Sequence, residues 1–459
     1  MPFSDGMEQP DALETRELQG TAGTLDQPRD CDDCDDCSSA SDSEPESEKH
    51  AYELHSWNDK KVPSIVIALL KQLRPGVDLT HVTLPTFILE PRSLLEKWSD
   101  FICYPMDLFC AMAEDDTKRR TLHLLSWFCS GFSMLPPGVR KPYNPVLGET
   151  FRCYQNHNRN PFQATIHPRF GFDISGAVSG EHHPTVYIAE QVSHHPPISA
   201  FYFSNRKAGF ASTGWIFTRS KFTGNSAGSI MEGRGRLYDL VRGQVWESTW
   251  PSAWGRGIFV GQYAMEMSGE ASCCCPDLGL EAKIKFLKKP LFGGERGMIG
   301  GEVRVDGRPV YTISGNHITH SVVTDLEDGQ QICVYDKELD QLIDKRVAPV
   351  AAQEPHESRA IWTHVTNALE MEPPDYEAAQ EAKIAVEEEQ RRIRKRAGTN
   401  VSTRYFTRDT WPDLGDRKSK VKPGHDWTYR WICTGPYEEG GEDPDRTMNV
   451  YREIREHVQ

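Results

Sequence analysis

Two adjacent histidines, His194 and His195, are followed directly by Pro196 and Pro197. The prolines exclude a helix, because each lacks a backbone N–H and has a fixed φ. Neighbouring side chains of an extended chain point to opposite faces, unless the prolines bend it enough for both rings to meet one anion. Two imidazoles that donate N–H groups and can gain a proton suit a phosphomonoester. The alternative is an ordinary turn with surface histidines.

Metal and nucleophile chemistry have weaker support. The sequence has no His-Glu-x-x-His motif, and the pair His182-His183 completes no clear ligand set. Cys31, Cys34 and Cys37 lie among aspartates without a fourth soft ligand nearby, which favours a solvated acidic tail. No Ser-His-Asp or Cys-His nucleophile context is visible. We therefore expect no metal, no cofactor and no catalytic residue.

Two further groups could bind an anionic or polar ligand. Lys141 and Asn144 belong to a Pro- and Gly-rich loop, Lys-Pro-Tyr-Asn-Pro-Val-Leu-Gly-Glu, which on its own would be an ordinary turn. Lys383, Glu387 and Arg391 are spaced i, i+4 and i+8, which places them on one stripe of a helix predicted over 375–397. That stripe is either a solvated ion-pair ladder or a polar wall for a phosphate and sugar hydroxyls.

The elements that must position these residues change along the chain. The patterns predict a short apolar helix over Ile65–Leu73, helices over 93–114 and 117–132, and an aromatic tail after 400 that packs irregularly. Strands are predicted at 186–189, 199–203, 214–218, 262–267, 282–286 and 301–305. We expect an α+β fold with a large antiparallel, near-closed β-barrel over about 140–350. More than about eight strands leave room for a ligand inside.

Composition divides the chain in two. Residues 1–55 contain sixteen acidic and three basic residues, a net charge of −13, so the other 404 residues carry only −2 of the total of −15. We expect 1–55 to be disordered and acidic, and 56–459 to be a folded domain that binds no nucleic acid. No secretory signal is visible, and the longest apolar run, Ile65–Leu70, is far below the roughly 20 residues of a bilayer span.

The segment Glu-Gln-Val-Ser-His-His-Pro-Pro, residues 190–197, resembles the signature of the oxysterol-binding-protein-related lipid-transfer proteins. The loop 141–149 is similar to their second hallmark, and the resemblance runs from about Val62 to Arg396, with the tail also similar. Segments 84–95 and 219–226 are most similar to the members that exchange phosphatidylserine for phosphatidylinositol 4-phosphate, and less similar to the sterol carriers.

The resemblance implies a role for each matching residue. The 4-phosphate would be bound by His194, His195 and Arg391, the inositol ring by Lys383 and Glu387, and the phosphodiester by Lys141. Phosphatidylserine would be bound by Leu84, Lys141, Asn144 and Ser220. Segment 62–84 would be a lid that covers the acyl chains when it is closed.

The resemblance also implies how the protein works. We expect a non-enzymatic carrier that exchanges phosphatidylserine and phosphatidylinositol 4-phosphate between membranes. Its partners would be the phospholipid, membrane surfaces and a contact-site anchor protein, at endoplasmic reticulum–plasma membrane contact sites in the cytoplasm. No pleckstrin-homology domain, diphenylalanine motif or C-terminal membrane span is seen, as in the short, freely diffusing members. Stretch 156–181 is expected to be a surface insertion.

Two rival functions remain open from the sequence. One is a sterol carrier, or a sterol-responsive signalling protein, that exchanges sterol for phosphatidylinositol 4-phosphate on the same fold. The other is a metal-dependent hydrolase built around the histidines. Bound sterol would distinguish the first rival, and stoichiometric zinc with turnover of a phosphate ester would distinguish the second.

Overall fold

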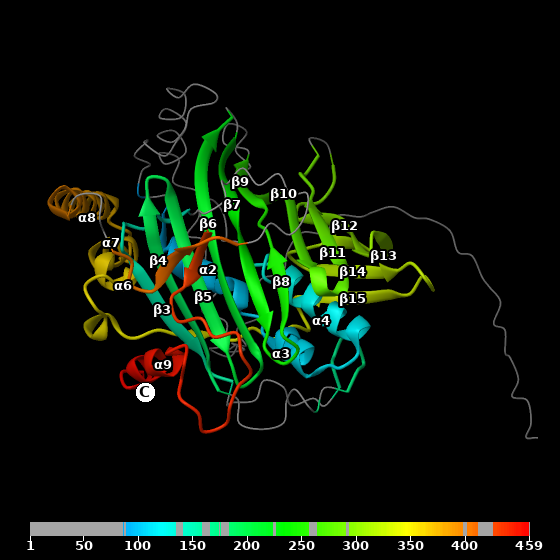
Figure 1. Ribbon diagram of the computed structural model, residues 1–459. Coiled ribbons are helices and arrows are strands. Elements are labelled where there is room, and N and C mark those ends of the chain that lie inside the picture. Colours follow the sequence, from blue (N-terminus) through cyan, green and yellow to red (C-terminus); the bar gives the residue numbers. More distant parts are fainter. Residues whose placement is uncertain are drawn as a thin grey trace, which may run out of the picture. The chain divides into compact units, whose positions relative to one another are not determined.

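The computed structural model describes residues 86, 89–134, 141–157, 166–173, 175, 183–223, 226–256, 264–290, 293–397, 402–411 and 426–458 (Figure 1). All of them belong to one compact unit, Glu53–Gln459. The predicted acidic segment 1–55, the lid 62–84 and its hinge residue Leu84 lie outside the described residues.

One antiparallel sheet of fourteen strands forms the body (Figure 1). Its strands are β3 (Thr150–Gln155), β4 (Thr185–His194), β5 (Pro197–Asn205), β6 (Phe210–Phe222), β7 (Ser226–Asp239), β8 (Gln244–Ser248), β9 (Ser252–Arg256), β10 (Ala264–Cys275), β11 (Leu280–Phe286), β12 (Met298–Val305), β13 (Arg308–Asn316), β14 (His320–Asp325), β15 (Gln331–Asp336) and β16 (Lys345–Arg346). The path runs from β16 through β3 to β15 in chain order, with β9 bridging β7 and β10. The predicted large antiparallel sheet is confirmed. Among the described residues no ladder joins its end strands, β15 and β16.

Short strands and helices flank this sheet. The strands are β1 (Leu89–Ser93), β2 (Lys141–Tyr143), β17 (Phe406–Asp409) and β18 (Asp426–Tyr429). The helices are α2 (Leu94–Trp98), α3 (Met106–Ala113), α4 (Thr117–Ser130), α6 (Ser358–Ile361), α7 (Thr363–Leu369), α8 (Tyr376–Ala397) and α9 (Thr447–Arg455), with 3-10 turns η4 (Ser99–Ile102), η5 (Pro276–Leu278) and η6 (Val350–Ala352). The continuous helix predicted over 93–114 is wrong. Pro105 interrupts it and becomes the N-cap of α3, because proline cannot continue a helical ladder.

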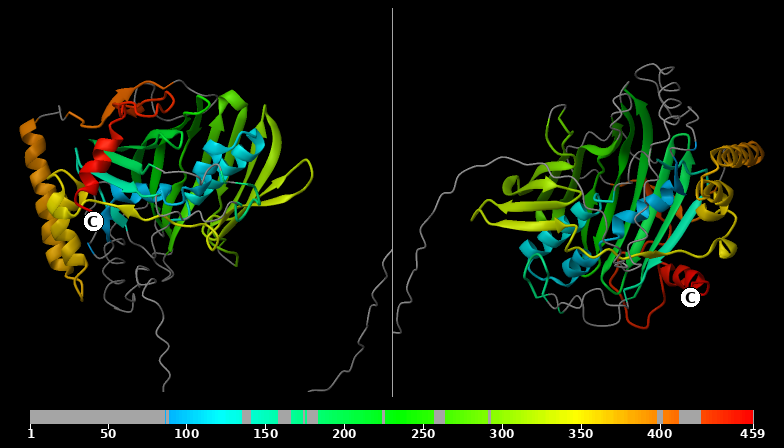
Figure 2. Two further views of the ribbon diagram at one scale, coloured as in Figure 1. Left: turned by 90° about the horizontal axis from the view of Figure 1, so that it is seen from below. Right: turned by 180° about the vertical axis from the view of Figure 1, so that it is seen from behind.

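Alternation along the strands separates two hydrophobic cores. In β4, Tyr187 and Ala189 pack with α3 and α4, whereas Val186 and Ile188 pack with the C-terminal tail. This is the period of two that a strand buried on both faces must have. Figure 2 shows the two covers from two directions, the N-terminal helices on one face and the tail with α9 on the other.

Two expectations about irregular regions are corrected. The tail forms a regular two-stranded antiparallel ladder of β17 and β18 rather than packing without order, because its aromatic residues alternate into the second core. The stretch 156–181 is not merely a surface insertion. Its described part buries His157 and His167, each 1% exposed, so it is anchored in the body.

None of the helices in the described ranges is both long enough and apolar enough to cross a bilayer.

Candidate functional site

The tandem histidines lie at the end of a hairpin. β4 ends at His194, β5 begins at Pro197, and these two residues pair across the ladder. Only His195 and Pro196 connect the strands, and the peptide bond between them is cis. The two imidazole rings have centroids 4.7 Å apart and an interplanar angle of 70°. The turn therefore holds both rings side by side at one end of the hairpin.

Lys141 begins β2, which pairs in parallel with Leu89 of β1. Burial lowers the pKa of Lys141, and the positive charge of Lys383 lowers it further. Among the described residues, no carboxylate acts on its ammonium group, whose pKa is influenced only by burial and by Lys383. A partly buried cation without a counter-ion is costly unless something else supplies the charge.

The predicted stripe on α8 exists as an ion-pair ladder. Lys383 Nζ donates to Glu387 Oε1 at 2.7 Å, and Arg391 Nη2 lies 3.6 Å from Glu387 Oε2. The helix begins as predicted, since Asp375 Oδ1 accepts the N–H of Ala378 at 2.9 Å. Lys383 is the buried member, with 13% of its side chain exposed, whereas 63% of Arg391 is exposed.

His194 connects the hairpin to α8. Burial, together with the positive charges of Arg394 and His195, lowers the pKa of His194 to about 4. A backbone hydrogen bond with Pro145 and the charge of Glu387 act in the opposite direction. Its Nδ1 has no hydrogen-bond partner in the described part of the chain. Because His194 is near Glu387 and Lys141 is near Lys383, the structure brings β2, the hairpin and α8 together.

We call this group the cation cluster: Lys141, His194, His195, Lys383, Glu387, Arg391 and Arg394. Its internal contacts involve one carboxylate, Glu387, which is already paired with Lys383. The cluster therefore presents more positive than negative groups in a partly buried place. Such a site favours an anion with several acceptor oxygens.

Arg394 was missed by the sequence reasoning. It follows Glu387 by seven residues and is therefore on the same face of α8. It is also the one residue of Arg391–Arg396 that is half-buried rather than exposed. Helical spacing could have found it, although the run of basic residues gave no reason to prefer one over another.

The carboxylates of the two motifs do not join the cluster. Buried Glu149 accepts hydrogen bonds from the Ser93 hydroxyl, the Val146 N–H, the Ser358 hydroxyl and the Trp362 indole. Burial raises the pKa of Glu149, and these donors oppose the rise. Glu190 accepts the backbone N–H groups of Arg404 and Tyr405 at 2.7 and 2.8 Å. Both glutamates therefore fasten the motif segments to the rest of the fold.

The other predicted site residues lie apart or outside. Asn144 is exposed in the loop after β2, and Ser220 lies near the end of β6, opposite Ser229 of β7. No described contact joins either residue to the cation cluster. Leu84 lies outside the described residues, as does His182, whereas the ring of His183 contacts that of Tyr437.

A small apolar cavity of about 20 Å³ lies inside the body, between α4 and the sheet. Its walls include Trp127, Phe128, Phe203, Trp246 and Trp250. Aromatic and aliphatic walls of this kind suit hydrocarbon rather than a charged ligand. In the described residues, the polar cluster and the apolar interior are therefore separate surfaces of one body.

Three comparisons relate the chain to known proteins. The oxysterol-binding protein family model matches residues 68–439. Oxysterol-binding protein-related protein 8 of Homo sapiens is 36% identical over 384 residues, which cover 82% of this chain and 39% of that relative. The chain thus spans less than half of the length of this relative.

Two solved structures are similar in fold. The Osh1 ORD domain in complex with ergosterol has a TM-score of 0.61 at 21% identity, over 83% of this chain and 88% of that one. The Osh3 ORD in complex with PI(4)P from Saccharomyces cerevisiae has a TM-score of 0.56 at 18% identity, over 86% and 94%. At these identities the likeness establishes the fold, and it confirms the predicted α+β class.

Proposed function

The chain belongs to the oxysterol-binding protein family, and from this premise we propose that it carries a phospholipid between membranes, held by its phosphate-bearing headgroup. The family prediction made from the two motifs is confirmed. The proposed activity is binding and transfer, and it breaks no covalent bond.

The observation that carries the proposal is the excess of positive charge in the cation cluster. Lys141 has no partner among the described residues, and the pKa of His194 is lowered to about 4 by burial and by neighbouring cations. A phosphate would give both groups an acceptor and would relieve their mutual repulsion. Each charge-assisted hydrogen bond of this kind contributes about 1.5–3 kcal/mol.

The acyl chains need a different environment. A lipid that crosses water exposes its hydrocarbon, at about 0.8 kcal/mol per CH₂ group. We propose that the apolar inner face of the sheet, together with the predicted lid 62–84, covers these chains during transfer; the cavity between α4 and the sheet, about 20 Å³, would have to widen to admit them. The separation of polar and apolar surfaces matches the two ends of a phospholipid.

We propose phosphatidylinositol 4-phosphate and phosphatidylserine as the exchanged pair. His194, His195 and Arg391 would bind the 4-phosphate, Lys383 and Glu387 the inositol ring, and Lys141 the phosphodiester. Asn144, Ser220 and Leu84 would serve phosphatidylserine with Lys141. Two lipids that compete for one interior exclude each other, so a gradient of one can drive the other. The Osh3 complex with PI(4)P supports the phosphoinositide half of this pair.

Liposome extraction tests the proposal. The double variant His194→Ala/His195→Ala should lose extraction of phosphatidylinositol 4-phosphate and keep extraction of phosphatidylserine. His364→Ala is the matched control, since His364 is exposed on α7. Equal loss of both lipids in the double variant would show that the histidines act only in folding. Leu84→Asp should weaken phosphatidylserine uptake, and unchanged uptake would remove that residue from the site.

Sterol is the alternative cargo, and the ergosterol complex of the Osh1 domain gives it a specific basis. Competition with a fluorescent sterol distinguishes the two. If phosphatidylinositol 4-phosphate displaces the sterol and phosphatidylserine does not, then sterol rather than phosphatidylserine is the second lipid. Native mass spectrometry of the purified protein would identify the lipid that it retains.

We propose that the protein acts peripherally, at endoplasmic reticulum–plasma membrane contact sites in the cytoplasm, with an anchor protein as partner. The relatives that match it are longer, and their whole-protein partners need not be shared. Imaging of the tagged full chain beside markers of both membranes tests the location, and a uniform cytosolic signal would contradict it.

A further inference from the structure

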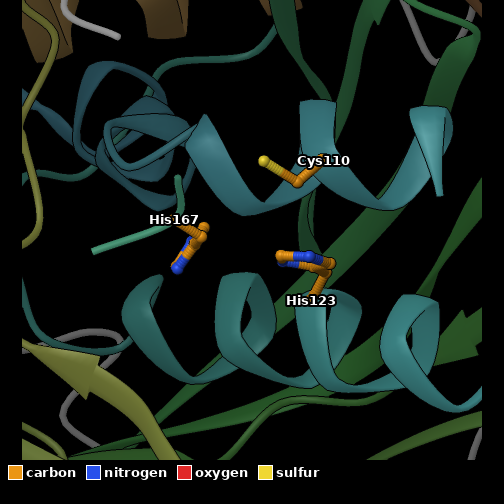
Figure 3. A group of neighbouring side chains, drawn as sticks. All are labelled: Cys110, His123 and His167. Carbon is orange, nitrogen blue, oxygen red and sulfur yellow. The ribbon is translucent and has the colours of Figure 1, made fainter. Parts of the chain in front are cut away.

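Two groups of cysteine, histidine and carboxylate side chains lie outside the cation cluster. The first is fully buried and contains Cys110 of α3, His123 of α4 and His167 (Figure 3). The second lies on the β14–β15 hairpin and contains His320, Cys333 and Asp336. Both have the residue types that bind zinc. The hydrogen bonds of the two groups show which of them is available to a metal ion.

The buried group already functions as a hydrogen-bonded network. His167 Nδ1 accepts the backbone N–H groups of Arg169 and Phe170 at 3.3 and 3.2 Å. A neutral imidazole that accepts at Nδ1 carries its proton on Nε2. That nitrogen lies 3.1 Å from Asp107 Oδ1, an ion-pair distance, although its N–H is not aligned for a hydrogen bond; because it carries the proton, it is not a free metal ligand.

Asp107 is the centre of this network. It accepts from His123 Nδ1 at 2.8 Å, from the Ser126 hydroxyl at 2.6 Å and from the Arg169 guanidinium. Arg169 continues to Asp340 at 2.9 Å. We call these residues the Asp107 network. The buried cation of Arg169 is matched by two carboxylates without a metal ion.

The hairpin group differs because a β-bulge creates it. His320 pairs with Asp336, Ser321 with Tyr335, and Val322 with Cys333, so Val334 is the extra residue. Cys333 and Asp336 are three positions apart and would lie on opposite faces of a regular strand. The bulge turns Val334 and Tyr335 inward, 0% and 1% exposed, and places Cys333 on the face of Asp336.

The distances on that face suit a tetrahedral ion. Cys333 Sγ lies 3.6 Å from His320 Nδ1, which lies 3.4 Å from Asp336 Oδ2. All three atoms are within 4.8 Å of one another. Zn–S bonds of about 2.3 Å and Zn–N or Zn–O bonds of about 2.0–2.1 Å imply ligand separations of about 3.3–3.6 Å.

Neighbouring groups orient these ligands. Asp336 Oδ1 accepts the N–H of Glu338 at 2.9 Å, which leaves Oδ2 directed at the histidine. The Asp336 N–H donates to Asp340 at 2.9 Å. About half of the His320 side chain, 52%, is exposed, so an ion can enter from solvent. Supporting hydrogen bonds of this kind are typical of metal sites.

We propose that His320, Cys333 and Asp336 bind a zinc ion, with the fourth position open to water or to a partner's ligand. The thiol of Cys333, which otherwise donates to the Tyr335 carbonyl at 3.4 Å, would lose its proton to the solvent as the Zn–S bond forms. Sulfur, nitrogen and oxygen together favour Zn²⁺ over Mg²⁺ or Ca²⁺. The ion would join the two strands at the edge of the sheet.

Cobalt substitution tests the proposal in the full chain. To remove a competing thiol source, the background variant replaces Cys31, Cys34 and Cys37 with serine. It should bind one equivalent of Co²⁺ with a thiolate-to-metal charge-transfer band, and Zn²⁺ should displace the Co²⁺. Cys333→Ser should abolish the band, and His320→Gln should weaken binding by more than about tenfold.

Two controls make the result decisive. Cys433→Ser replaces another partly exposed free cysteine and should leave the band unchanged. Cys110→Ser tests the buried group and should also leave it unchanged. Zinc should further slow amide hydrogen exchange over 320–336, which Asp336→Asn should prevent while circular dichroism reports its folding. Loss of the band in Cys110→Ser, its survival in Cys333→Ser, or its absence from the background variant would overturn the proposal.

Discussion

The cation cluster and the Asp107 network are both partly or wholly buried groups of charged side chains, but they differ in how the charges are matched. Asp107 accepts hydrogen bonds from Arg169, His123 and Ser126 and lies at ion-pair distance from His167, and Arg169 is shared with Asp340. Lys141 and the Nδ1 of His194 have no partner among the described residues. Charged residues lie close together in both regions, but only the Asp107 network provides carboxylates for its buried guanidinium group.

This difference separates a structural group from a binding group. A network whose charges are matched is not stabilised by a ligand, and removal of one member lowers the folding stability strongly. A cluster that is short of acceptors tolerates the loss of a cation and gains from an anion. The two regions should therefore respond oppositely to mutation, in stability and in lipid extraction.

The largest effect is expected from Asp107→Ala. It leaves the guanidinium of Arg169, whose side chain is 0% exposed, without its closest carboxylate. Removal of one partner of a buried ion pair costs about 3–5 kcal/mol of folding free energy. Urea denaturation measures this loss. Asp115→Ala is the control, because Asp115 is fully exposed and should change stability by less than about 0.5 kcal/mol. Equal effects of the two variants would contradict the role of the network.

Lys141→Met should leave folding stability intact and weaken lipid extraction. Methionine keeps most of the volume and removes a partly buried charge that has no described counter-ion, so the free energy of unfolding should not fall. Extraction of phosphatidylinositol 4-phosphate should fall about 10- to 100-fold, since one charge-assisted hydrogen bond contributes about 1.5–3 kcal/mol. Lys337→Met, at an exposed lysine, should leave both quantities unchanged. If Lys141→Met lowered stability and left extraction normal, Lys141 would be a structural residue and not a ligand-binding one.

The pH dependence of binding should reveal His194. Its pKa is lowered to about 4 by burial, Arg394 and His195, against the charge of Glu387 and a bond with Pro145. A bound phosphate raises this pKa, so binding takes up a proton and tightens as the pH falls from the bound pKa toward 4. One proton allows at most about tenfold per pH unit.

The measurement is lipid affinity between pH 5.5 and 7.5, in the parent chain and in His194→Gln. Because the phosphate itself titrates in this range, the informative quantity is the difference between the two slopes. Parallel slopes would show that His194 takes up no proton when the headgroup binds.

The smallest effect sharpens the comparison on one helix. Arg391 and Arg392 are adjacent and 63% exposed, but Arg391 faces Glu387 whereas Arg392 faces Glu388 and Glu389. Both alanine variants should change stability by less than about 1 kcal/mol. Only Arg391→Ala should weaken phosphoinositide extraction, by a few-fold. An equal loss in Arg392→Ala would mean that only net charge matters.

Sequence reasoning recovered what local patterns encode. Period-two stretches located strands such as β5 and β11, and the start and end of α8 followed from Asp375 and the basic last turn. The helix predicted over 93–114 failed at Pro105, where the segment turns to fit under the sheet. Strands β7, β8 and β9 were not located, because glycines and charged residues interrupt their alternation.

The sites were harder to predict, because they depend on distant contacts. The anchoring roles of Glu149 and Glu190 need partners more than 200 residues away, and Arg394 could not be distinguished from its basic neighbours. The hairpin group His320, Cys333 and Asp336 was not predicted from the sequence, because these residues lie on two strands and a β-bulge brings them to one face of the sheet. Motif spacing finds the residues that bind a ligand, but it does not show which neighbours complete their hydrogen bonds.

The bond from Glu190 to the main chain of Arg404 and Tyr405 has a practical consequence. Any shortened version that stops after α8 would remove both donors and leave a carboxylate with no exposed surface unsolvated, four positions before the first ligand histidine. Expression boundaries for crystallography or transfer assays should therefore extend past residue 429, so that β17 and β18 are both retained. A fluorescent reporter attached beyond α9 would leave this junction intact.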